Sequence, residues 1–184
     1  MKKLMFMLAA VAMAASAQAA SVYWTCTNVK DSSGSAVSGL AYFLTTDMLS
    51  YSDAQALAGK GVDAFTTALG SAYSYNGSSG GFGKATPGIA NTTLGLTDGT
   101  EYTAYLMIFD TATITDSSNY YLTGTKSLLT LSGADDVAQV KWGTQSTPSQ
   151  ATGAWKGVSD VPEPTSGLLM LVGLAGLALR RRRA

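Results

Sequence analysis

Hydrophobic and polar residues alternate along the middle of the chain with the two-residue period of β-strands. The strongest case is residues 100–110, where alternate positions are apolar on both faces. One face carries Tyr102, Ala104, Leu106 and Ile108, and the other carries Tyr105, Met107 and Phe109. A strand that is apolar on both faces belongs in the middle of a covered sheet. Similar patterns predict strands over residues 22–29, 39–46, 72–75, 89–96, 120–131 with a break at Gly124, and 137–142.

Residues 52–70 have a different pattern, which predicts two short helices inserted between strands. Ser52 and Gln55 have the spacing of a capping box at the start of the first helix. Asp63 is placed to cap the second helix, and Gly70 is placed to end it. Residues 76–83 hold four glycines and two serines, a composition that predicts a surface loop.

Short strands separated by turns predict a mainly β fold, a single antiparallel β-sandwich over residues 20–145 with a short helical insert. Within it, residues 96–102 resemble the tyrosine corner of immunoglobulin and fibronectin III-like sandwiches. There a tyrosine that opens a strand, here Tyr102, hydrogen-bonds back across the turn. Asp98 stands where proline is usual, and the resemblance implies architecture only. Residues 146–160 are polar and predict a linker, in which Trp155 is able to pack.

The amino-terminal residues 1–19 have the organisation of a secretory signal peptide. Lys2 and Lys3 precede an uncharged apolar run, and small residues follow at Ala17 and Ala19, where signal peptidase requires them. We therefore expect cleavage after Ala19. An uncleaved membrane anchor is the alternative, which the small residues make less favourable.

The carboxyl-terminal residues 161–184 combine three unlike elements. Pro162, Glu163 and Pro164 disfavour a helix and leave an extended segment. Residues 165–179 carry no charge and predict a transmembrane helix about 22 Å long, which is short for a hydrocarbon core of roughly 30 Å. The cluster that follows, Arg180, Arg181, Arg182 and Arg183, is expected to stop transfer and stay on the cytoplasmic side.

This order of elements resembles the PEP-CTERM sorting signal of Gram-negative bacteria. The resemblance is confined to the tail. It implies that exosortase, a membrane-embedded cysteine protease or transpeptidase, recognises Pro162, Glu163 and Pro164. It also implies an inner-membrane precursor that is later released or transferred to the cell surface or extracellular matrix. The alternative is the permanent tail anchor of an ordinary single-pass protein.

Charge and composition exclude several functions for the exported body. Residues 20–161 contain six lysines and eleven acidic residues, a net charge of −5, without any arginine or histidine. A body of this charge is expected to bind nucleic acid poorly, and it offers no histidine for catalysis or metal binding. Cys26 is the single cysteine, and its place in an alternating run predicts a buried structural thiol.

The remaining candidate chemistry is limited to carboxylates and aromatic rings. Asp135 and Asp136, and the oxygen-rich residues 116–119, are better explained as solvated turns than as catalytic or calcium sites. We expect no catalytic residue, cofactor or metal. Five aromatic residues could form a face that stacks on sugars, although aromatic residues on β-strands are more often part of a core: Trp24, Trp142, Trp155, Tyr120 and Tyr121.

Three classes of function remain open at this stage. A structural or matrix protein of the cell surface is favoured, because the chain has a sorting tail and no catalytic set. A glycan-binding module, with an extracellular polysaccharide as partner, is the second class. A carboxylate-based hydrolase is the third, and it would need two carboxylates about 5–9.5 Å apart in a cleft.

Overall fold

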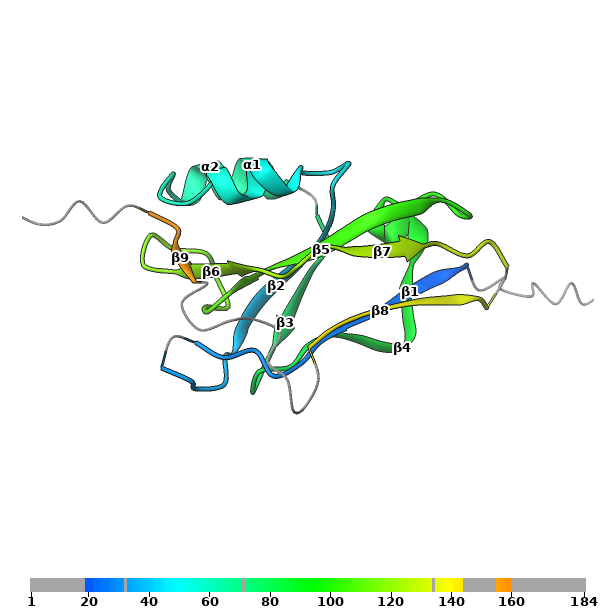
Figure 1. Ribbon diagram of the computed structural model, residues 1–184, viewed down its shortest axis with the longest axis horizontal. Coiled ribbons are helices and arrows are strands. Elements are labelled where there is room, and N and C mark those ends of the chain that lie inside the picture. The colour runs from blue at the N-terminus through cyan, green and yellow to red at the C-terminus, as the bar shows by residue number, and fades with distance from the viewer. Residues whose placement is uncertain (1–18, 32, 71, 134, 144–154, 160–184) are drawn as a thin grey trace, which may run out of the picture.

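The computed structural model describes residues 19–31, 33–70, 72–133, 135–143 and 155–159. These residues form a mainly β structure with two sheets and few helices, as the sequence predicts (Figure 1). The strands are β1 (Ser21–Cys26), β2 (Gly39–Thr45), β3 (Ser74–Gly77), β4 (Phe82–Ala90), β5 (Glu101–Phe109), β6 (Asn119–Leu122), β7 (Lys126–Leu129), β8 (Val137–Trp142) and β9 (Lys156–Gly157). The helices are α1 (Tyr51–Ala56), α2 (Val62–Leu69) and the short 3-10 helix η1 (Asn91–Leu94).

One sheet has three strands in the order β4-β1-β8, and the other has six. The larger sheet runs β3-β2-β5-β6-β9, with β7 also paired to β5. The pairing of β1 with β8 is parallel, in register from Ser21 opposite Val137 to Cys26 opposite Trp142. The expected all-antiparallel arrangement is therefore wrong at this pair. Almost the whole body separates β1 from β8, which leaves ample chain for the crossover that a parallel pair needs.

The larger sheet is covered on both faces. Helices α1 and α2 lie over one face, and the three-stranded sheet lies over the other (Figure 1). The core between the sheets includes Trp24, Phe43, Leu106, Ile108 and Trp142. The core under the helices includes Phe65, Tyr105, Met107, Phe109 and Tyr120. Strand β5 contributes to both cores, which confirms the prediction from its doubly apolar pattern.

The helical insert is present, but its caps differ from the predicted ones. Ser50, and not Ser52, is the N-cap of α1, and its hydroxyl accepts a hydrogen bond from the Asp53 amide at 3.1 Å. Gly61, and not Asp63, occupies the N-cap of α2 without a side-chain bond. Gly70 follows the last turn of α2, as predicted. The helix begins one residue before Ser52, so this serine lies in the first turn and the capping position falls to Ser50.

The glycine-rich segment 76–83 is not a free loop, because its ends belong to β3 and β4. Gly77 pairs with Gly39, and Gly83 pairs with Thr25, so this hairpin joins the two sheets. A Cβ atom on Gly83 would lie 2.2 Å from the Trp24 carbonyl oxygen. Glycine is required here because the strands approach too closely for a side chain. The prediction of a loop from glycine content did not consider this reason for glycine.

The predicted strand over 89–96 ends early, at Ala90, and gives way to η1. The tyrosine corner beyond it is confirmed, since the Tyr102 hydroxyl accepts a hydrogen bond from the Thr97 amide at 2.9 Å. Asp98 replaces the usual proline and has its own partner, the Asn91 side-chain amide at 2.7 Å. The turn is therefore fixed by two side chains from different elements.

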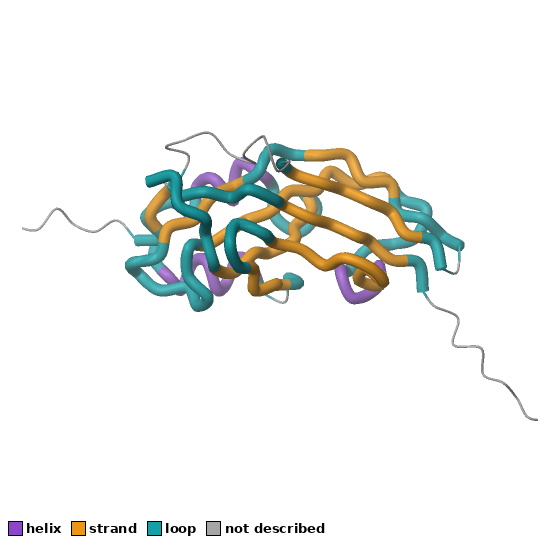
Figure 2. Tube along the Cα trace, turned by 90° about the horizontal axis from the view of Figure 1, so that it is seen from below, coloured by secondary structure: helices purple, strands orange, loops and turns teal. Residues whose placement is uncertain are grey.

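The first and the last described residues lie at opposite ends of the molecule. Strand β9 lies at one end of the long axis, and the beginning of β1 lies at the other (Figures 1 and 2). None of the helices within the described ranges has the length and apolar character needed to span a membrane. The predicted transmembrane helix 165–179 lies outside those ranges.

Candidate functional site

Residues 155–159 fasten the end of the described chain to the body, and we call this segment the exit clamp. It contains β9, which pairs antiparallel with β6 through Asn119 opposite Gly157 and Tyr120 opposite Lys156. The sequence predicted that residues 146–160 form a linker. The exit clamp shows that residues 155–159 of this range belong to the folded body.

Backbone hydrogen bonds hold the exit clamp from two sides. On one side, the Val158 amide donates to the Ser118 carbonyl at 2.9 Å. On the other side, the amides of the turn between α1 and α2 donate to the clamp. Gly59 donates to the Gly157 carbonyl at 3.1 Å, and Gly61 donates to the Val158 carbonyl at 2.9 Å. The clamp therefore connects the edge of the larger sheet to the helical insert.

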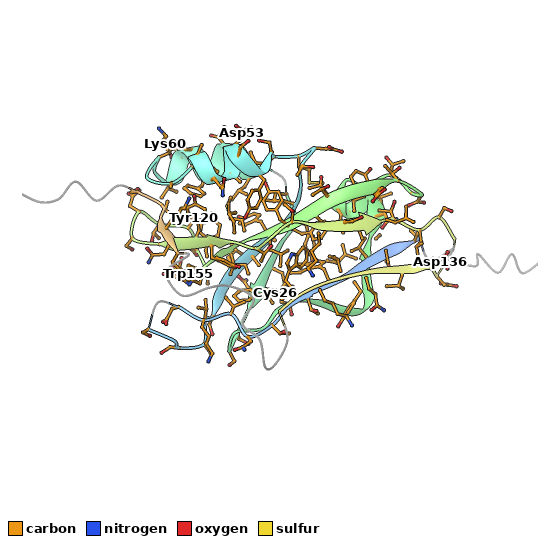
Figure 3. All side chains as sticks on the ribbon, viewed as in Figure 1. Cys26, Asp53, Lys60, Tyr120, Asp136 and Trp155 are labelled. Carbon is orange, nitrogen blue, oxygen red and sulfur yellow. The ribbon has the colours of Figure 1, made fainter. Side chains whose placement is uncertain are left out.

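Three side chains of the clamp add further contacts. Val158 is fully buried in the core under the helices. The Trp155 ring lies 5.9 Å from the Tyr121 ring, and its Nε1 donates to the Lys30 carbonyl at 2.8 Å. The Ser159 hydroxyl donates to Asp116 Oδ1 at 2.5 Å. Figure 3 shows Trp155, Tyr120 and Lys60 at the end of the molecule opposite Asp136.

The residues predicted to direct sorting lie beyond this clamp. Pro162, Glu163, Pro164 and the arginine cluster Arg180, Arg181, Arg182 and Arg183 are outside the described residues, as is Ala17. Ala19 is exposed at the start of the described chain, and Ala20 is buried. Strand β1 begins at Ser21, so the expected cut after Ala19 would leave every strand intact.

Two of the carboxylates that could serve a catalytic or calcium site, Asp136 and Asp116, accept hydrogen bonds from other groups of the body. Asp136 accepts a hydrogen bond from the Gly133 amide at 3.1 Å. Asp116 accepts from Ser159, and the Asn119 side chain donates to Asp110 at 2.8 Å. Within the part of the chain that the structure describes, no group of three or more histidine, cysteine or acidic residues could hold a metal ion.

The aromatic residues considered for sugar stacking do not form an exposed face. Trp24, Trp142, Tyr120 and Tyr121 are buried, and they divide between the two cores. The favoured interpretation of strand aromatic residues as part of a core is confirmed for these four, because their rings fill the space between covered layers. Cys26 is buried in the core between the sheets, as predicted.

A small cavity of about 220 Å³ lies beside the clamp, lined by Tyr51, Gln55, Tyr120, Leu122 and Lys156. Burial raises the pKa of the Tyr120 hydroxyl to about 12. It donates to the Ala54 carbonyl at 3.3 Å and so ties β6 to α1. A larger cavity of about 550 Å³ lies between the end of α2 and η1, with Met48 and Tyr73 in its wall. Neither cavity gathers charged groups that would indicate a reaction.

The clamp is the part of this site that reasoning from the sequence missed. Two signals were available: Trp155, a large aromatic residue, and Val158, an apolar residue in an otherwise polar stretch. The segment is too short for a periodic pattern, so its pairing could not be deduced.

Comparison with known protein families supports the interpretation of the tail. The family model for the PEP-CTERM protein-sorting motif matches residues 160–183. No curated protein and no solved structure matches the chain. The match begins at the residue after Ser159, so the motif follows the exit clamp directly.

Proposed function

We propose that this chain, which carries a PEP-CTERM sorting motif, is a structural component of the cell surface or extracellular matrix. Its motif is that of exported proteins that exosortase processes. The observation that carries the proposal is the direct attachment of this motif to a folded β body through the exit clamp. The body is the cargo, and the tail determines its destination.

The proposed route begins with export. Signal peptidase removes residues 1–19, and the helix 165–179 with its arginine cluster anchors the precursor in the inner membrane of a Gram-negative bacterium. Exosortase then acts near Pro162, Glu163 and Pro164. Because the apolar segment is short and contains three glycines, it holds the chain in the membrane weakly, which suits an intermediate more than a permanent anchor.

For the body we propose a β-sandwich of the immunoglobulin or fibronectin III-like type without catalytic activity. Two observations support this class: the core that the two sheets share and the Tyr102 hydrogen bond across its turn. Two carboxylates that could have served a hydrolase, Asp136 and Asp116, accept hydrogen bonds from the Gly133 amide and the Ser159 hydroxyl. Four of the five aromatic residues that the glycan-binding alternative needs are buried in the cores.

The proposal is tested by changing the sorting motif and following the precursor in cells. With Glu163→Ala, we expect unprocessed precursor to accumulate in the inner membrane, while the matched change Glu101→Ala in the exposed body leaves processing unchanged. Pulse-chase labelling followed by membrane fractionation measures both. Normal processing of the Glu163→Ala chain would overturn the proposal and favour a plain tail anchor.

A further inference from the structure

We propose that exosortase docks on the body surface around the exit clamp while it binds the sorting motif, and that the clamp fixes the spacing between the two. This inference rests on the proposed function, because it assigns a second contact to the same processing enzyme. The surface consists of residues 57–61 between the helices, the loop 113–118 and β9.

The first argument is reach. A fully extended chain spans at most about 3.6 Å per residue, so Pro162 lies within about 11 Å of Ser159 and Pro164 within about 18 Å. This first distance is about the diameter of one helix with its side chains. An enzyme that encloses the motif therefore meets the body at the clamp.

The second argument is that the clamp is held on both sides. Strand β9 pairs with β6, and the carbonyls of Gly157 and Val158 accept amides from the turn between α1 and α2. An edge strand with one free side could bind a partner as an added strand. Here both sides are occupied, so the segment acts as a fixed point from which the tail departs.

The third argument is the character of the surface. The side chain of Val158 is buried, whereas that of Lys156 in β9 is exposed. Lys60 is also exposed, and it forms an isolated β-bridge with Ser159 at this end of the molecule (Figure 3). The contact offered to the enzyme is consequently polar and of modest size, which suits a transient complex. This contact would speed processing through bivalent binding. When the body is bound, a fixed spacing raises the effective concentration of the motif at the enzyme.

The experiment uses two insertions of the same flexible Gly-Ser spacer, about twelve residues long, in the full-length chain. One lies between Ser159 and Asp160 and separates the motif from the body. The matched control lies between Ser149 and Gln150, upstream of the clamp, and leaves that spacing unchanged. Pulse-chase labelling measures the rate at which each precursor is processed.

We expect the downstream spacer to slow processing by about tenfold and the upstream spacer to change it by less than about twofold. Equal rates for the two insertions would overturn the inference. In an otherwise unaltered chain, Val158→Ser should release the clamp and slow processing in the same way. Processing of the Val158→Ser chain at the normal rate would also contradict it.

One further variant distinguishes a failure of this inference from a failure of the proposed function. Glu163→Ala in the same assay reports whether processing depends on the motif at all. If processing depends on Glu163 but is insensitive to both spacers, the docking surface is wrong and the proposed function stands. If Glu163→Ala has no effect, the proposed function itself fails.

Discussion

Strand β5 and the exit clamp belong to the same sheet but differ in how many side chains they bury. Six consecutive residues of β5, from Ala104 to Phe109, are buried, and the strand pairs with β2, β6 and β7. The exit clamp buries one side chain fully, that of Val158, and is held mainly by backbone hydrogen bonds. Side-chain burial thus stabilises the body, while a small set of directional bonds fixes where the tail leaves it.

The largest expected effect comes from emptying the core at the end of β5. The Phe109 ring lies 5.6 Å from the Phe65 ring and 6.1 Å from the Tyr120 ring. We expect Phe109→Ala to lower the free energy of unfolding by about 3–5 kcal/mol. Leu129→Ala, at a side chain that is 56% exposed, should change it by less than about 0.5 kcal/mol. Urea denaturation of residues 20–160 measures both.

A smaller and local effect is expected at the clamp. Val158→Ala should lower the free energy of unfolding by about 1–2 kcal/mol, because two buried methyl groups are lost at an edge. The amides of Gly59 and Gly61, which donate to the clamp, should exchange with deuterium faster, while those of β5 keep their rates. Lys156→Ala is the control, since this side chain is exposed. Equal acceleration in β5 would show that clamp and core open as one unit.

The cap of α1 offers a matched pair of serines. Ser50→Ala removes the acceptor for the Asp53 amide and should cost about 1 kcal/mol of stability. Ser52→Ala should cost less than about 0.5 kcal/mol, because Ser52 lies inside the first turn. Thermal denaturation distinguishes them. A larger loss for Ser52→Ala would restore the cap that the sequence spacing predicted.

The smallest effect is expected at Asp31. This residue follows Lys30, whose carbonyl accepts the hydrogen bond from Trp155 Nε1. Hydrogen bonds from the Ser33 side chain and from the Ser35 and Ser33 amides hold the pKa of Asp31 below its ordinary value. Because the folded pKa is depressed, the stabilisation is present above the ordinary aspartate pKa of about 3.9 and is lost as pH falls through the lower folded value. NMR titration of the Asp31 carboxyl should show this lowered pKa, and Ser33→Ala should raise it. An unchanged titration in Ser33→Ala would contradict the assigned cause.

The same comparison explains how much the sequence could predict. Alternation over residues 100–110 located β5 and both of its buried faces, because a long periodic pattern records burial. Glycine composition misassigned residues 76–83, where close approach of strands and not flexibility requires glycine. The clamp escaped prediction because its bonds use backbone groups, which every sequence has. The tail was identified because its three unlike elements stand in a fixed order.

The central claim is that the tail is a processed sorting signal attached to a folded body. Intact-mass spectrometry of the form recovered from the cell surface tests it most directly. We predict a chain that begins at Ala20 and lacks residues 165–184, with the exit clamp retained. A surface form that still carries residues 165–184 would contradict the account and identify the tail as a permanent anchor.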